Sequence, residues 1–259
     1  MLSLEQIKNQ YDGNLHKYPR GLLREYLQYL ILDILYSNQL SDKLTFVGGT
    51  CLRIVYGIDR FSEDLDFDNK NLTQDEFVEL CNYITNELSQ YGYKVDVKFV
   101  FKKAFHCYFK FSNILFENDL IPMKTEIINI HVDTPDQGYE YEPEIYILNK
   151  FDIFRQIQVA PKSVILSQKL WTITRRERSK GRDFYDILTL LKDTKPDIGF
   201  LEDKFGSKDA EEIKMKILEG IEDIDLDDMA KDVKVFLIKP KDSENIKLFR
   251  EYLNQELFK

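Results

Sequence analysis

The sequence is poor in the features that mark secreted, membrane-spanning or zinc-stabilised proteins. It has three cysteines in 259 residues, Cys51, Cys81 and Cys107. Their odd number and wide spacing give neither a disulfide framework nor a CxxC zinc motif. No apolar run approaches the roughly 18 residues of a membrane helix, and the N-terminus, MLSLEQIKNQ, lacks the basic-then-apolar pattern of a secretion signal. We therefore expect a reduced, cytoplasmic protein that does not enter a membrane.

Histidine is equally scarce, and no internal repeat or low-complexity tract is present. The three histidines, His16, His106 and His131, show no metal-ligand spacing among themselves. His106 falls on the polar face of an expected strand, where most histidines are simply exposed to solvent. No histidine-based metal site is therefore expected.

What the chain does contain is a globular balance of 43% apolar and 31% charged residues, with a net charge of −9. The charge is unevenly distributed. Residues 161–182 carry seven basic side chains and one acidic one, a local charge of 7 − 1 = +6. A negatively charged partner would be attracted to this segment rather than to the acidic protein at large.

Hydrophobic periodicity predicts an α/β (α+β) fold with a boundary near residue 160. The expected domains are 1–160, mixed α/β, and 161–259, helical. In the first domain we expect helices at 22–37 and after Thr50, a helix opened by the Thr73–Glu76 capping box, and strands at 44–49, 64–67, 95–101, 105–111, 124–131 and 151–160. In the second domain one helix is expected to end at Gly181 and another to follow it.

The most informative stretch is FVGGTCLRIVYGIDRFSEDLDFD at residues 46–68. Gly48 and Gly49 allow the backbone to approach a ligand closely, and Thr50 is the expected N-cap of a helix whose free N–H groups favour an anion. Asp64 and Asp66 are two residues apart on a strand, so both side chains leave the same face. Two carboxylates so close together favour a cation between them, and oxygen ligands suit Mg²⁺.

The segments GGTCLRIVYG and RFSEDLDF resemble sequences of the AbiEii/AbiGii toxin-type branch of the polymerase-β-like nucleotidyltransferase superfamily. Thr50 stands where the superfamily commonly has Ser, which keeps the hydroxyl. The resemblance implies a nucleotidyltransferase domain with a mixed sheet, followed by a C-terminal helical domain. It also implies that Asp64 and Asp66 hold two Mg²⁺ ions and that Gly48–Thr50 binds the nucleoside triphosphate.

The superfamily uses a third carboxylate on a later strand to bind metal and to help deprotonate the attacking hydroxyl. Our candidate is Glu126, on the strand expected at 124–131, with Asp133 as the second choice. An ordinary exposed pair between Glu126 and Lys124 is the alternative interpretation.

Arg60 and Ser62 flank the paired carboxylates and are candidates for the nucleotide site. The forked guanidinium of Arg60 suits a triphosphate. A salt bridge from Arg60 to Asp59 or Glu63 would explain this residue equally well. Ser62 precedes Asp64 by two residues, so a phosphate placed on it would add negative charge beside the metal site.

A second cluster lies at residues 167–191, where a lysine precedes several basic residues and an Arg-Asp-x-x-Asp helix. From composition alone this is a helix hairpin with a solvated basic face. The family resemblance implies that Lys169 neutralises the triphosphate or the leaving pyrophosphate, and that Asp183 orients Lys169 or completes the site. The remaining basic residues would then guide an RNA backbone: Arg175, Arg176, Arg178, Lys180 and Arg182.

These features predict a Mg²⁺-dependent enzyme that moves NMP from an NTP to an acceptor hydroxyl in a cleft between the two domains. The resemblance implies the toxin of a bacterial toxin–antitoxin or abortive-infection system, acting on RNA, with the tRNA 3′ end favoured and a cognate antitoxin as a partner. Two alternatives remain open. One is a nucleotide-binding module without turnover, and the other is transfer to a protein or small-molecule acceptor.

Overall fold

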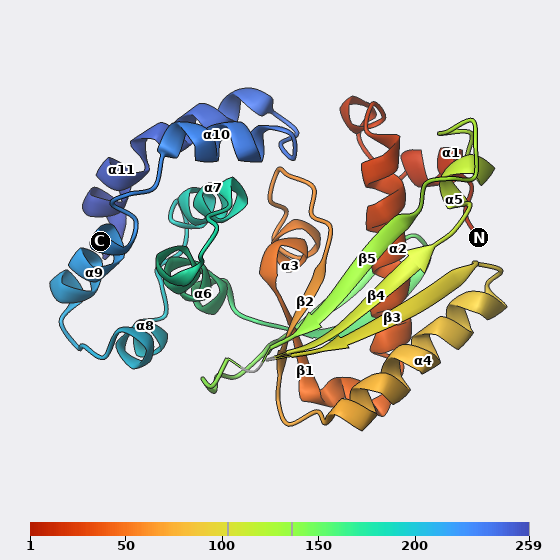
Figure 1. Ribbon diagram of the computed structural model, residues 1–259, viewed down its shortest axis with the longest axis horizontal. Helices are drawn as coiled ribbons and strands as arrows, with labels where there is room; N and C mark the ends of the chain where they lie inside the picture. Colours follow the sequence, from red (N-terminus) through yellow and green to blue (C-terminus); the bar gives the residue numbers. More distant parts are fainter. Residues whose placement is uncertain (103, 136, 259) are drawn as a thin grey trace. The chain divides into compact units, whose positions relative to one another are not determined.

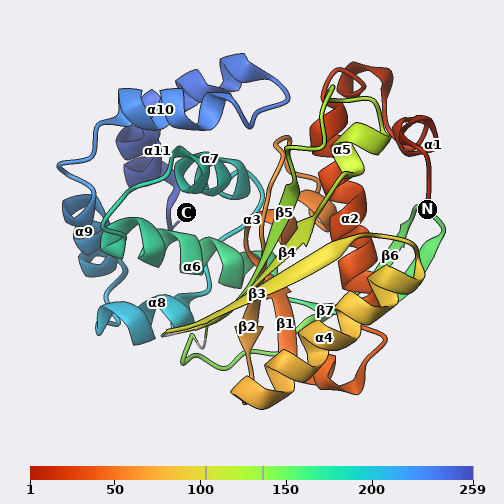
Figure 2. The same ribbon diagram turned by 45° about the vertical axis from the view of Figure 1, so that its right-hand side comes forward.

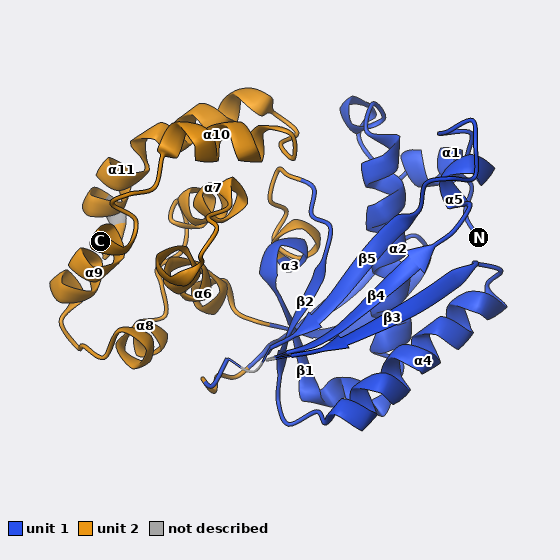
Figure 3. Ribbon diagram, viewed as in Figure 1, with its two compact units in different colours: residues 1–51, 61–138, 143–159 blue, residues 52–60, 139–142, 160–259 orange. Residues whose placement is uncertain are grey.

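The computed structural model describes residues 1–102, 104–135 and 137–258. The chain divides into two compact units (Figures 1 and 3). Unit 1 comprises residues 1–51, 61–138 and 143–159, and unit 2 comprises residues 52–60, 139–142 and 160–259. The chain therefore changes unit at five points, after residues 51, 60, 138, 142 and 159.

Unit 1 is built on one seven-stranded sheet with the strand order β3-β4-β5-β2-β1-β7-β6. The strands are β1 (Leu44–Val47), β2 (Leu65–Asn69), β3 (Val95–Phe101), β4 (Phe105–Phe111), β5 (Ile128–Thr134), β6 (Glu144–Lys150) and β7 (Ile153–Val159). The pairs β1–β7 and β2–β5 are parallel and the other four are antiparallel, so the sheet is mixed, as predicted.

Two long helices cover one face of this sheet, α2 (Pro19–Leu35) and α4 (Gln74–Gln90) (Figures 1 and 2). Most of α2 is apolar and buried, as its sequence predicts. Helix α4 begins at the predicted capping box, in which the Thr73 hydroxyl accepts from the Glu76 amide and the Glu76 carboxylate accepts from the Thr73 amide. Unit 1 also contains the short elements α1 (Leu4–Lys8), η1 (Gly13–Leu15), η2 (Gln39–Lys43) and α5 (Ile114–Glu117).

Alternation along the strands separates an apolar face from a polar one. On the face under α2 and α4, Leu65 of β2, Val132 of β5 and Cys107 of β4 stand in register, and each is at most 1% exposed. Successive side chains of a strand point to opposite faces. Asp66, Asp133 and His106, the neighbours of these core residues, therefore share the opposite face.

Unit 2 consists mainly of helices from residues 160–259, with the short segments 52–60 and 139–142 added from earlier in the chain. Its helices are α6 (Lys162–Arg175), α7 (Gly181–Leu190), α8 (Ile198–Phe205), α9 (Ala210–Gly220), α10 (Leu226–Lys234), η3 (Pro240–Leu248) and α11 (Phe249–Glu256). Helix α3 (Gly48–Ile54) starts in unit 1 and ends in unit 2. No helix within the described residues is both long and apolar enough to cross a bilayer.

Gly181 does not end a helix, as the sequence analysis expected, but begins α7. A Cβ on Gly181 would lie 2.0 Å from the Met229 carbonyl oxygen of α10, so the glycine allows the two helices to approach closely. Its amide also donates to Asp232 Oδ2 at 2.8 Å. Helix α6 ends earlier, at Arg175, which leaves residues 176–180 as a loop.

Candidate active site

The turn from β1 into α3 places Gly48 against Asp66 of strand β2. Gly48 has a φ of +77°, a conformation that side chains with a Cβ rarely adopt. A Cβ at this position would lie 2.3 Å from Asp66 Oδ2. The helix begins at Gly48 itself, so Thr50 lies in its first turn and is not the expected N-cap. The Thr50 hydroxyl instead donates to the Asp64 carbonyl oxygen, which ties the glycine turn to the start of β2.

We expect Gly48→Ala to lower any activity that depends on Asp66 by about 100-fold, because a displacement of about 1 Å in an active site can cost that much. The methyl group forces either the turn or the Asp66 carboxylate to move. Gly57→Ala is the matched control, since Gly57 has a similar φ of +73° but nothing within 4 Å of its added Cβ. Transfer rates and melting temperatures of both variants test this. Equal losses of activity would show that the clash with Asp66 is unimportant.

Asp66, Asp133 and His106 form a row across three adjacent strands. In the sheet register, Asp66 of β2 is the partner of Asp133 of β5, and Asp133 is the partner of His106 of β4. His106 Nδ1 lies 2.8 Å from Asp133 Oδ1. Asp64, just before β2, is close enough to raise the pKa of the Asp133 carboxyl. The polar face of the sheet therefore gathers three carboxylates beside the Gly48 turn.

The electrostatics of Asp133 favour a cation at this place. Burial is the largest influence and raises the pKa of the Asp133 carboxyl, while His106 and His131 oppose that effect and Asp64 adds to it, and the net shift is upward. Burial therefore makes the negative charge of Asp133 costly, and the repulsion from Asp64 adds to that cost. A metal ion among the three carboxylates would remove the repulsion and supply the missing positive charge.

The structure places Glu126 away from this row. The expected strand at 124–131 instead runs from Ile128 to Thr134, so that Glu126 precedes it. Glu126 is 51% exposed and forms an ion pair with Arg20. The carboxylate that the fold brings beside Asp66 is Asp133, the second choice of the sequence analysis.

Arg60 and Ser62, the two candidates that flank the carboxylates, both contact other parts of the chain. The Ser62 carbonyl accepts a hydrogen bond from Gln28 Nε2 at 3.2 Å. Arg60 is 2% exposed, and its Nε and Nη2 donate to the two carboxylate oxygens of Asp186, each at 2.6 Å. This bidentate pair engages the Nε/Nη2 edge of the guanidinium and holds Arg60 against Asp186 inside unit 2, a partner that the sequence analysis did not consider.

Asp186 also connects Arg60 to the predicted lysine of unit 2. Lys169 Nζ lies 2.8 Å from Asp186 Oδ2 and 2.8 Å from Asp183 Oδ1. The second oxygen of Asp183 accepts from Arg176 Nη1 at 2.6 Å. The structure therefore brings Lys169 and Asp183 together and adds Asp186 as the member that sequence reasoning did not assign, although its position one helical turn after Asp183 was a usable signal.

Lys169 and Asp183 each stabilise the charged form of the other. Burial alone would lower the pKa of Lys169, but Asp183 and Asp186 outweigh it and raise the pKa of the ammonium. Burial alone would raise the pKa of Asp183, but Lys169 and Arg176 outweigh it and lower that pKa to about 2. In the ion pairs described above, three cations, Arg60, Lys169 and Arg176, face the two carboxylates of Asp183 and Asp186.

Two arginines of the basic segment at residues 161–182 contact aromatic rings within unit 2. The Arg175 guanidinium lies 4.4 Å from the ring centroid of Trp171, and that of Arg182 lies 4.4 Å from the ring centroid of Phe236. Arg178 and Lys180 lie in the exposed loop between α6 and α7. The positive surface that remains for a partner is therefore centred on this loop.

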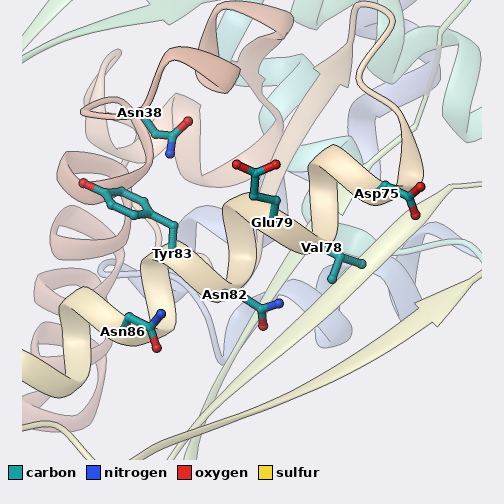
Figure 4. Close-up of a pocket in the computed structure, with 7 residues that line it drawn as sticks. All are labelled: Asn38, Asp75, Val78, Glu79, Asn82, Tyr83 and Asn86. Carbon is teal, nitrogen blue, oxygen red and sulfur yellow. The ribbon is translucent and has the colours of Figure 1, made fainter.

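Unit 1 also has an open groove of about 640 Å³ along the outer side of α4 (Figure 4). Figure 4 shows Tyr83 and Asn38 at one end and Asp75 at the other, with amide and carboxylate side chains between them. The groove contains none of the predicted site residues. We therefore do not assign the chemistry to it.

Comparison with known proteins agrees with this geometry. The family model described as "Nucleotidyl transferase AbiEii toxin, Type IV TA system" matches residues 31–256. Among solved structures, JHP933 from Helicobacter pylori aligns with a TM-score of 0.55 at 17% identity, over 92% of this chain and 93% of that one. A second H. pylori protein, described as a candidate nucleotidyltransferase, aligns with a TM-score of 0.58 at 17% identity, over 92% and 96%. At such identities the two structures support the fold alone. No curated protein matches significantly.

The family match covers most of the chain, and it spans both the glycine turn with its carboxylates and the Lys169 network. The predicted α/β class with a mixed sheet is confirmed by the fold and by these neighbours. The chain therefore belongs to the AbiEii toxin family and is a nucleotidyltransferase.

Proposed function

We propose that this nucleotidyltransferase moves NMP from an NTP to a hydroxyl group of RNA, with the tRNA 3′ end as the favoured acceptor, and that it acts as the toxin of a toxin–antitoxin pair. The observation that carries the proposal is the grouping of Asp64, Asp66 and Asp133 beside the Gly48 turn. Carboxylates clustered next to a glycine turn suit a reaction at a metal-bound triphosphate.

The donor set fits Mg²⁺, because it consists of carboxylate oxygens on one sheet face, and burial together with the nearby Asp64 raises the pKa of the Asp133 carboxyl. Asp64, Asp66 and Asp133 would hold the metal. When bound, Mg²⁺ would supply charge neutralisation at the phosphate oxygens. Asp133 takes the place proposed for Glu126 in the sequence analysis. The turn at Gly48, Gly49 and Thr50 would leave room for the triphosphate.

In unit 2 we propose that Lys169 supplies positive charge for the phosphates and that Asp183 holds it in place. Lys169 Nζ is 2.8 Å from Asp183 Oδ1, and Arg60 and Arg176 add two further cations to the same group of ion pairs. A lysine fixed by two carboxylates keeps its orientation without a substrate, so its ammonium does not have to be ordered during the reaction.

RNA as the acceptor is supported by the exposed cations Arg178 and Lys180 on the α6–α7 loop, with Arg175 at the end of α6. A local basic strip is sufficient for backbone contacts on a protein whose net charge is −9. A cognate antitoxin is proposed from the family description alone.

The test is transfer from α-³²P-labelled NTPs, one base at a time, to total bacterial RNA in Mg²⁺. Asp64→Ala protein, shown by circular dichroism to be folded, is the control. We expect a labelled RNA band from the wild-type protein only, because Asp64 is needed to hold the metal. The base and the length of the labelled RNA then identify the substrate pair.

Two other results would redirect the proposal. Label on protein or on a small molecule, with none on RNA, would keep the enzyme class and replace the acceptor. Nucleotide binding without any labelled product would indicate a binding module. Equal labelling by wild type and Asp64→Ala would remove the carboxylates from the mechanism.

A further inference from the structure

We propose that His106, His131 and Asp133 form a binding site for a divalent transition metal ion of the Zn²⁺ or Co²⁺ class. The site lies on the polar face of the unit 1 sheet, on β4 and β5. The histidines show no metal-ligand spacing in the sequence: His106 and His131 are 25 positions apart, but antiparallel pairing of β4 with β5 brings them together.

The three ligand atoms converge. One atom from each residue can be chosen so that all three lie within 4.8 Å of one another. His106 Nδ1, His131 Nε2 and Asp133 Oδ1 are all shielded from solvent, and the first and last are 2.8 Å apart. Ligands on a tetrahedral zinc ion at 2.0–2.1 Å are separated by about 3.4 Å. Small side-chain rotations therefore suffice to close the site.

The rings are held in place before any metal arrives. His131 stacks on Tyr108 with centroids 4.3 Å apart and planes 4° from parallel, and His106 stacks on His131 at 5.3 Å and 27°. Tyr108 is also the cross-strand partner of His131. Such support reduces the rotamer freedom that two imidazoles would otherwise lose on binding an ion.

The choice of metal follows from the ligand atoms. Imidazole nitrogens bind Zn²⁺, Co²⁺ and similar ions, whereas Mg²⁺ prefers oxygen ligands and keeps its waters. Two histidines and one carboxylate leave at least one coordination position open, as in zinc sites with three protein ligands. The inference therefore adds a second kind of metal beside the Mg²⁺ proposed above, and the two ions would share Asp133.

The experiment is a titration of the full-length protein with Co²⁺ in excess Mg²⁺, followed by visible d–d absorption. We expect a saturable band at one equivalent that Zn²⁺ bleaches by displacement. His106→Ala/His131→Ala should weaken Co²⁺ binding by more than about tenfold, since even changes outside the ligand set cost that much. His131→Phe keeps a ring on Tyr108 while removing the ligand, so it separates the lost ligand from lost folding.

His16→Ala is the matched control, because His16 is the one remaining histidine of the sequence, and it should leave the titration unchanged. Asp64→Asn should also retain the Co²⁺ band, although it abolishes the proposed Mg²⁺ chemistry, so the two proposals can fail separately. A band that persists in folded His131→Phe and in the double variant would overturn the inference. So would a band that Asp64→Asn or excess Mg²⁺ removes.

Discussion

Asp133→Asn is expected to lower nucleotidyl transfer by about 100-fold or more, the typical effect of removing a group that stabilises charge in a transition state. Glu126→Gln is its matched partner, with the same loss of one charge, and should stay within about twofold of the wild type, as for most exposed substitutions. The reason is placement: Asp133 is the cross-strand neighbour of Asp66, whereas Glu126 lies before β5 in an exposed pair with Arg20.

Both variants can be compared in the labelled-NTP assay over a range of Mg²⁺ concentrations. If Asp133 holds the metal, Asp133→Asn should also need more Mg²⁺ for half-maximal rate, a change that general misfolding would not produce. A large loss in Glu126→Gln, with Asp133→Asn near wild type, would reverse the assignment of the third carboxylate.

Asp186→Asn is expected to lower the free energy of unfolding by about 3–5 kcal/mol, the range found when one member of a buried ion pair is removed. Asp186 is 0% exposed and is the shared acceptor for Arg60 and Lys169. The asparagine keeps the shape of the side chain but leaves two buried cations with one fewer carboxylate between them.

Asp193→Asn is the control in the same unit, because Asp193 is 61% exposed and pairs with Lys162 at 2.9 Å. Exposed pairs contribute about 0–1 kcal/mol. Urea unfolding can be followed by the fluorescence of Trp171, the single tryptophan, which lies on α6 of unit 2 against Phe205. Equal midpoints for the two variants would mean that the buried network adds nothing to stability.

The sequence predicted those elements whose pattern is local. The apolar run of α2, the capping box of α4 and the alternation of β3 and β4 all depend on residues close together in the chain. The choice of the third carboxylate depended on which face of its strand each residue occupies. Ile128, Ile130 and Val132 point into the core, so Glu126, which has the same parity, could not have shared a face with Asp133 even on a longer strand.

Strand β6 was missed because its hairpin turn has unusual residues. Phe151 and Asp152 join β6 to β7 with φ values of 58° and 63°, a two-residue turn that usually contains Gly or Asn. Phe151 tolerates this conformation because its ring is buried against the rings of Tyr26 and Tyr29, with centroids 5.2 Å and 5.1 Å away. Such compensation comes from tertiary packing and leaves no turn signal in the sequence.

The row formed by Asp66, Asp133 and His106 could not be predicted, because it depends on strand order. Asp66, Asp133 and His106 become neighbours only when β5 lies between β2 and β4, and no local pattern specifies that order. The Arg60–Asp186 pair likewise joins residues 126 positions apart. The role of Gly181 also depends on tertiary packing. This glycine allows α7 and α10 to approach closely and does not end a helix.

The five changes of unit along the chain make residue 160 a poor place to divide the protein. A fragment consisting of residues 1–160 would carry the 52–60 segment without the rest of unit 2, and Arg60 would lose Asp186. Strand β2, which carries Asp66, starts five residues after Arg60. Gene fusions, split-protein designs and shuffling of the second unit between homologues would therefore have to exchange residues 52–60 and 139–142 together with 160–259. Exchange of one contiguous block would separate groups that stabilise each other.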